Sequence, residues 1–163
     1  MFFFILSLIL LAIIINFNNN HCIYLYENNV LITIGHNAFY EGISNKCIME
    51  GYGKITYADR SYFYGNFISN KKYGYGITIF NSSIYHSLKG NYVNDFNHGF
   101  FSLTFRDNRK FIFYYMYGNT NYYGSMYYPN NTVKYGNYYF HNNTFIEDLN
   151  NILSSKQISI YTH

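Results

Sequence analysis

Acidic, histidine and cysteine side chains are sparse in this chain, and their spacing does not suit catalysis or metal binding. The 163 residues include 8 acidic residues and 6 histidines. The acidic residues are Glu27, Glu41, Glu50, Asp59, Asp95, Asp107, Glu147 and Asp148. Only Glu147 and Asp148 are adjacent, and the histidines lack the regular spacing of metal ligands. Gly-x-Ser-x-Gly is absent, and the Gly-x-Gly segments open predicted strands rather than helices, unlike phosphate loops. We therefore expect no catalytic residue, no metal site and no cofactor, and the chain is not predicted to be an enzyme.

The charge balance argues against nucleic-acid binding. The formal net charge is +3, whereas a nucleic-acid-binding domain carries a basic face or stripe. Two small basic clusters, residues 70–72 and 106–110, fall at predicted hairpin tips. Charges at such tips are usually solvated, so we expect no nucleic-acid partner.

Three Asn-x-Ser/Thr sequences are candidate glycosylation sites, at Asn81, Asn130 and Asn142. Asparagine is so abundant in this chain that about three such sequences would arise by chance. They therefore do not establish a lumenal location by themselves.

The N-terminus carries a continuous apolar run, Phe2–Ile15, broken only by Ser7. The run is shorter than the roughly 17–25 residues of a membrane-spanning helix and suits the apolar region of a signal peptide. However, no Lys or Arg precedes it, and no small-x-small cleavage site follows it. A helical membrane anchor and a cleaved secretory signal both remain open. Residues 1–21 are thus assigned to this segment and a polar linker, and the predicted location is membrane-associated or secretory.

An internal repeat organises most of the remaining chain. Residues 40–62 align with residues 63–85: in each, a glycine is followed nine residues later by Gly-Tyr-Gly and then by an aromatic residue. The leading positions are 42, 65, 90, 113 and 136, a period of twenty-three with one two-residue insertion. The repeat-defining residues are Tyr40, Gly42, Gly51, Gly53, Tyr57, Gly65, Gly74, Gly76, Phe80, Gly90, Gly99, Phe105, Gly124, Tyr128 and Gly136. At three positions where the repeat expects glycine, the chain has Phe101, Phe113 and Tyr122 instead, so the fourth unit is irregular.

This pattern resembles the MORN repeat (membrane occupation and recognition nexus). Units of that family read approximately Tyr-Glu-Gly, a polar turn, Gly-x-Gly, then an aromatic residue and another turn. The best matches are Tyr40–Gly42, Gly51–Asp59 and His98–Gly99, and the resemblance covers residues 27–143. The resemblance implies a ribbon of β-hairpins.

We accordingly predict an all-β fold: an elongated single-layer antiparallel β-meander of about five 23-residue MORN-like hairpin repeats over residues 22–143. Side chains alternate between the two faces of a strand, so Gly53, Ile55 and Tyr57 share one face. Each glycine leaves a hollow on that face, and we expect a ring from an adjacent strand to fill it.

Residues 144–163 are predicted to form a short C-terminal capping helix and a tail. Thr144 and Glu147 match a capping box. The apolar residues at helical spacing are Phe145, Ile146, Leu149, Ile152 and Leu153. A dimerisation or partner helix is the alternative, and residues 157–163 could add an edge strand.

The two cysteines, Cys22 and Cys47, fall in nearly equivalent turns of adjacent repeats. Equivalent positions two strands apart are about 9–10 Å from each other in a flat sheet, whereas a disulfide tolerates roughly 4.4–6.8 Å between Cα atoms. A Cys22–Cys47 disulfide is therefore disfavoured unless those turns bend together.

The resemblance implies a non-catalytic scaffold that tethers proteins to a membrane, or organises one. The membrane contact would be Phe2–Ile15, and a protein partner would lie along the aromatic face of the sheet, with weak phospholipid binding as a further expectation. MORN repeats also occur beside the catalytic domains of phosphatidylinositol phosphate kinases and SET-domain methyltransferases. A regulatory fragment of such an enzyme, without its catalytic domain, is therefore one alternative, and a secreted binding protein is the other.

Overall fold

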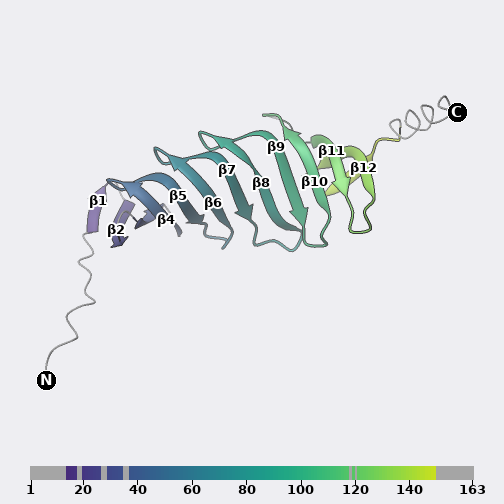
Figure 1. The fold of residues 1–163 in the computed structure, drawn as a ribbon. Helices are drawn as coiled ribbons and strands as arrows, with labels where there is room; N and C mark the ends of the chain where they lie inside the picture. The colour runs from purple at the N-terminus through teal and green to yellow at the C-terminus, as the bar shows by residue number, and fades with distance from the viewer. Residues whose placement is uncertain are drawn as a thin grey trace, which may run out of the picture. The chain divides into compact units, whose positions relative to one another are not determined.

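The computed structural model describes residues 14–17, 20–26, 29–34, 37–117, 119 and 121–149. Over these residues the chain is all-β (Figure 1). The strands are β1 (Ile14–Phe17), β2 (Asn20–Tyr26), β3 (Asn29–Ile34), β4 (Ala38–Asn45), β5 (Ile48–Thr56), β6 (Tyr62–Ile68), β7 (Lys71–Ile79), β8 (Tyr85–Val93), β9 (Phe96–Phe105), β10 (Lys110–Tyr115), β11 (Asn121–Tyr127), β12 (Val133–Tyr139) and β13 (Thr144–Glu147).

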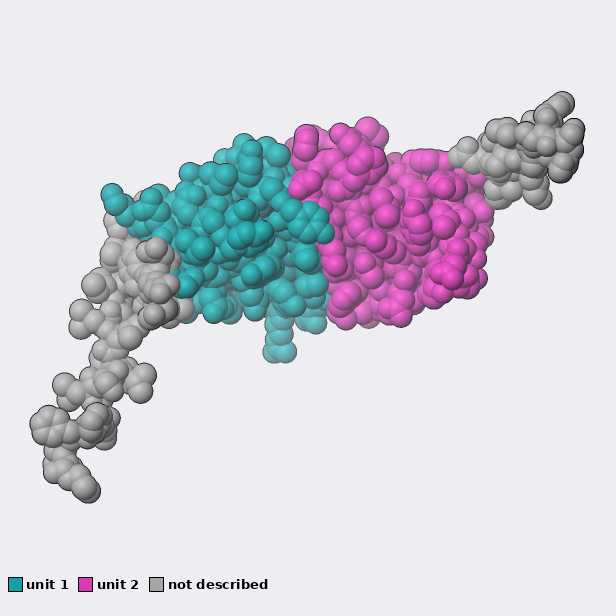
Figure 2. All heavy atoms as spheres, in the orientation of Figure 1, with its two compact units in different colours: residues 1–81, 92–96 teal, residues 82–91, 97–163 magenta. Residues whose placement is uncertain are grey.

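The strands belong to two compact units, coloured teal and magenta in Figure 2. Unit 1 comprises residues 1–81 and 92–96, and unit 2 comprises residues 82–91 and 97–163. In unit 1, each strand from β1 to β7 pairs antiparallel with the next. In unit 2, the strands from β9 to β13 do the same. The predicted antiparallel hairpin meander is therefore confirmed within each unit.

Strict alternation of side chains gives each strand an inner and an outer face. In β6, Phe63, Gly65 and Phe67 are buried on the inner face, whereas Tyr64 between them is exposed. The same period of two appears in β4, where Tyr40 and Ser44 are buried. Apolar residues thus occur on both faces, but only the inner face is a core.

Tight turns join the strands at one edge of unit 1. Both residues of each turn have positive φ, as a type I′ hairpin turn requires. These turns are Lys46–Cys47, Ser69–Asn70 and Asn94–Asp95. Because they recur at the repeat spacing, they fix the register of successive hairpins.

Three of the longer connections begin at a repeat aromatic residue and share one loop structure. In residues 57–61, 105–109 and 128–132, the amide of the first residue donates to the carbonyl of the fifth, and the amide of the fourth donates back to the carbonyl of the first. In each loop the third residue, Asp59, Asp107 or Asn130, also accepts a hydrogen bond from the amide two residues later. The aromatic positions Tyr57, Phe105 and Tyr128 therefore open a repeated loop.

A row of glycines, one on each successive strand, crosses the inner face of unit 1. Gly42 is opposite Gly53, Gly53 is opposite Gly65, and Gly65 is opposite Gly76 on successive strands. A Cβ at Gly53 would overlap the Tyr40 ring, and a Cβ at Gly76 would overlap the Phe63 ring. The glycines thus provide the hollows that rings occupy.

Unit 2 contains a corresponding row of opposed inner-face positions, in which some glycines are replaced. Phe113 is opposite Phe101 on one side and Gly124 on the other, and Gly124 is opposite Gly136. The Phe101 ring occupies the space that a Cβ at Gly90 would need. Phenylalanine at two glycine positions of the repeat therefore keeps the inner face filled.

The inner face of unit 2 closes on itself. The rings of Phe105 in β9 and Tyr138 in β12 have centroids 5.4 Å apart, and the hydroxyl oxygens of Tyr85 in β8 and Tyr138 are 3.2 Å apart. In a flat sheet, strands three positions apart would be separated by about 14 Å. The sheet of unit 2 therefore curls around an aromatic core.

The two ends of the described chain differ from the sequence-based expectation. Thr144–Glu147 is strand β13, paired with β12, so the helix predicted to begin at Thr144 is wrong over these four residues. Its pairing satisfies backbone groups along the edge of β12, and a 2.7 Å ion pair from Lys134 to Glu147 joins the two strands. The predicted helical residues after 149 lie outside the described residues.

At the N-terminal end, Ile14 and Ile15 begin strand β1 rather than ending a helix. A continuous apolar run does not distinguish a buried strand from a helix by periodicity, which explains the error. Strand pairing also starts N-terminal to residue 22, because β1 pairs with β2. The remainder of the predicted N-terminal helix, residues 2–13, lies outside the described residues. In the part of the chain that is described, no helix is long and apolar enough to cross a membrane.

Candidate functional surfaces

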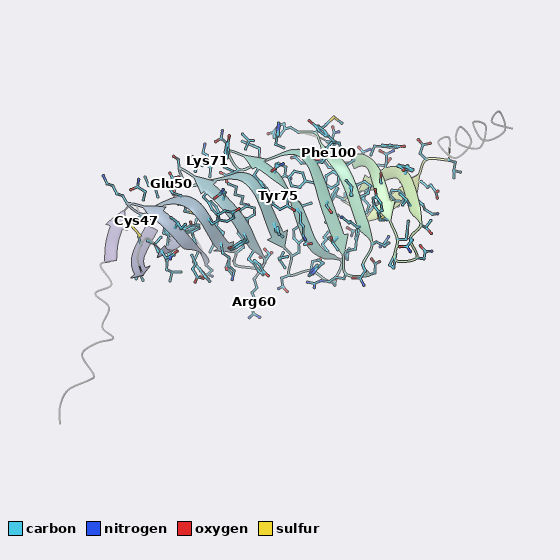
Figure 3. The ribbon with its side chains drawn as sticks, viewed as in Figure 1. Cys47, Glu50, Arg60, Lys71, Tyr75 and Phe100 are labelled. Atoms are coloured by element: carbon cyan, nitrogen blue, oxygen red, sulfur yellow. A yellow bond between two sulfur atoms is a disulfide. The ribbon has the colours of Figure 1, made fainter. Side chains whose placement is uncertain are left out.

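Cys22 and Cys47 form a disulfide, with their Cα atoms 6.0 Å apart (Figure 3). The expectation that geometry disfavours this bridge is wrong. Cys22 is buried in strand β2 rather than in a turn, and Cys47 is the second residue of the turn between β4 and β5. The flat-sheet distance does not apply, because the turn lies close to the preceding repeat.

The neighbouring turns show why. Asn70 occupies the same turn position as Cys47, and its amide donates to the carbonyl of Met49 while its Oδ1 accepts from the amide of Met49 at 2.7 Å. Asp95 makes the same two bonds with Lys72 one repeat further on, its Oδ1 accepting at 2.8 Å. We call this reciprocal pair of bonds the turn clamp. Cys47 uses a covalent bond at the position where later repeats use the turn clamp.

The inner face of unit 1 also holds a cation. The Lys72 ammonium lies 4.6 Å from the centroid of the Phe63 ring, 5.4 Å from that of Tyr57 and 5.6 Å from that of Tyr92. Burial lowers the pKa of Lys72, and Asp95 acts in the opposite direction. The face on which Gly53, Ile55 and Tyr57 were grouped is therefore occupied by the chain's own side chains.

The outer face of unit 1 is exposed and aromatic. Tyr52 and Tyr64 are 56% and 51% exposed, and their ring centroids are 6.2 Å apart at an interplanar angle of 38°. Ile43 and Phe39 on β4 are also exposed on this face. Sequence reasoning missed these residues, although their alternation with Gly53 and Gly65 could have assigned them to the outer face.

A shallow groove of about 620 Å³ lies on this outer face. It is lined by Asn29, Glu41, Ile43, Tyr52, Lys54 and Tyr64, together with the backbone of Gly42 and Gly53. Glu41 and Lys54 are opposite each other on β4 and β5, and the Lys54 ammonium lies 4.9 Å from the centroid of the Tyr62 ring. The groove therefore combines an aromatic platform with one charge of each sign. We call these groove residues the tyrosine platform.

Unit 2 contains a smaller pocket of about 390 Å³. Its walls include stacked rings of Tyr115 and Tyr122, with centroids 5.5 Å apart, and the rings of Phe113 and Phe140. Burial, followed by the neighbouring Tyr115, raises the pKa of Tyr122 to about 12. Asn97, Asn119 and His141 supply polar groups, and none of the described lining residues is a carboxylate, lysine or cysteine. It could accept a small apolar ligand but contains no nucleophile–carboxylate pair.

The predicted absence of a metal site can be compared only with the described part of the chain. There, no group of three or more His, Cys, Asp and Glu residues could hold a metal ion. Glu41 and Glu50 are separated on different strands, and Asp59 and Asp107 accept hydrogen bonds within their own loops.

The three candidate glycosylation asparagines are all exposed. Asn130 is in the loop between β11 and β12, Asn142 is in the turn before β13, and Asn81 follows β7. The structure thus places each of them in a surface connection.

Comparison with known proteins gives no relative: no family model and no curated protein matches this chain.

Proposed function

We propose that this chain is a non-catalytic, MORN-like repeat scaffold that binds a protein partner through the tyrosine platform and is held at a membrane by the part of the N-terminal apolar run that precedes strand β1, residues 2–13. The observation that carries the binding role is the exposure of Tyr52 and Tyr64 on an ordered sheet face. Large exposed aromatic residues rimmed by polar groups are typical of interaction surfaces. Glu41 and Lys54 add charges that can orient a partner.

A site-specific photocrosslinker tests the binding role. The full-length chain would carry the crosslinking residue at position 64. The control chain would carry it at position 60 instead, where Arg60 lies in the loop between β5 and β6 of the same unit (Figure 3). After irradiation in cells, we expect a discrete protein adduct from position 64 and none from position 60. Tyr52→Ser should reduce the adduct from position 64, whereas Tyr127→Ser in unit 2 should not. Equal adducts from both positions would contradict the proposal.

Alkaline carbonate extraction combined with intact-mass measurement tests the tether. We expect a chain that retains its N-terminal segment and stays in the membrane pellet. A chain shortened by the N-terminal segment and released into the supernatant would exclude a permanent anchor.

That second result would favour another function, a secreted binding protein. The Cys22–Cys47 disulfide favours this candidate, because disulfides persist mainly in oxidising compartments. The tyrosine platform would then meet an extracellular partner, and the same crosslinking variants would be irradiated as secreted chains together with that partner.

A further inference from the structure

We infer that Asn130 and Asn142 are N-glycosylated, and that the repeats fold in an oxidising, lumenal compartment. The inference concerns modification and compartment and does not depend on the tyrosine platform being a binding surface.

The disulfide is the first observation. Both cysteines of the chain pair with each other, and Cys22 is only 1% exposed. Cys47 occupies the turn position of Asn70 and Asp95, so the bridge ties this turn to the preceding repeat, as the turn clamp does in later repeats. A disulfide that joins buried Cys22 to half-buried Cys47 at a repeated structural position indicates a chain that folds where disulfides form.

The second observation is the shared geometry of two sequons. Oδ1 of Asn130 accepts a hydrogen bond from the amide of Thr132 at 3.1 Å, and Oδ1 of Asn142 accepts one from the amide of Thr144 at 3.2 Å. In both, the side-chain oxygen is bound by the backbone of the sequon's own threonine, while all four residues are exposed. Among the described residues, Nδ2 of Asn130 and Nδ2 of Asn142 have no recorded hydrogen-bond acceptor, so both amide nitrogens are accessible to the modification.

Asn81 differs from both. Its Nδ2 donates to the carbonyl of Asp59 at 2.8 Å, connecting two loops of unit 1. The next residue, Ser82, accepts from the amides of Ile84 and Tyr85. Because the Asn81 amide nitrogen is used in this hydrogen bond between two loops, Asn81 is expected to be unmodified.

The modification needs a lipid-pyrophosphate-linked oligosaccharide as the donor. Nδ2 forms a bond to the anomeric carbon of the sugar, and the bond between that carbon and the pyrophosphate oxygen breaks. Nδ2 loses one proton, and the lipid pyrophosphate leaves. A glycan is bulky and hydrated, and both loops can carry one because they face solvent.

The experiment uses the full-length chain, tagged at its C-terminus and expressed in a eukaryotic cell. Peptide N-glycosidase in heavy-oxygen water converts each glycosylated Asn to labelled Asp, which peptide mass spectrometry locates. We expect label at Asn130 and Asn142, none at Asn81, and a Cys22–Cys47-linked peptide without reductant. Unlabelled Asn130 or Asn142, label at Asn81, or two alkylatable thiols would overturn the inference.

Matched threonine variants separate glycosylation from folding. Thr132→Ala removes the sequon but keeps the backbone amide that bonds to Asn130, so the loop should persist while one glycan is lost. Thr132→Ser keeps both the sequon and the glycan. Thr144→Ala and Thr144→Ser should behave in the same way for the second glycan. A glycan count unchanged in Thr132→Ala would overturn the assignment at Asn130.

Discussion

At the scale of single residues, the repeat glycines perform two different tasks. Gly76 has a buried ring, that of Phe63, where its Cβ would be. Gly74, two residues earlier, has a φ of 70° and no atom within 4 Å of a built Cβ. It lies in a bulge, where β7 has extra residues relative to β6. One glycine thus provides space, and the other provides backbone conformation.

The two tasks predict opposite tolerances to substitution. Gly76→Ala should lower the free energy of unfolding by about 1–3 kcal/mol, because the fully buried Phe63 ring cannot move aside without strain. Gly74→Asn should cost much less, because asparagine tolerates positive φ and the space around the position is open. Denaturant unfolding of both variants measures the difference. Equal losses would show that ring packing against the glycine is not what position 76 provides.

At the scale of the elements, the turn clamp makes each hairpin depend on the one before it. Asn70→Gly keeps a residue that accepts positive φ but deletes the Oδ1 that binds the Met49 amide. We expect a loss of about 1 kcal/mol and faster hydrogen exchange at the Met49 amide. Asn70→Asp is the matched control, because Asp95 makes the same bonds naturally at the next turn. If the Met49 amide exchanges equally fast in both variants, the clamp is not what protects it.

The elements also show how far the sequence could predict the structure. The glycine period predicted the antiparallel meander. It also predicted that rings would fill the hollows at the glycines, as Tyr40 does at Gly53 and Phe63 does at Gly76. The Cys22–Cys47 bridge was missed because a flat-sheet distance ignores turns that bind back to the preceding hairpin.

The candidate surface was predictable only in part. The sequence indicated one aromatic face, but exposed Tyr52 and Tyr64 lie on the face opposite the glycines. Curvature decides which aromatic face is enclosed, and in unit 1 curvature depends on contacts between strands that are not adjacent, such as Tyr40 in β4 with Phe67 in β6. The strand at Thr144–Glu147 was missed because a capping-box pattern is local, whereas the edge of β12 is a tertiary partner.

At the scale of the whole molecule, buried tyrosines in both units couple the fold to alkaline pH. Burial, followed by the charge of Glu50, raises the pKa of Tyr40 to about 12. Burial, then Asp95 and Asp59, raises the pKa of Tyr57 to about 12, and Tyr122 in unit 2 reaches about 12 as well. Burial also raises the pKa of Tyr138, which is hydrogen-bonded to Tyr85. These side chains are kept neutral by the core that they form.

The sign of the resulting pH dependence follows from the raised values. A phenol whose pKa is higher in the folded chain than the ordinary value of 10.0 stabilises the fold fully below pH 10.0, and that stability is lost as pH rises toward about 12. We therefore expect the free energy of unfolding of the intact chain to fall steeply between these two pH values, with tyrosinate absorbance rising as the chain unfolds. Tyr122→Phe should weaken the pH dependence, because it removes one of the titrating groups while its ring still fills unit 2. A free energy of unfolding that stays constant across this interval would mean that the buried phenols ionise as readily in the folded chain as in the unfolded one.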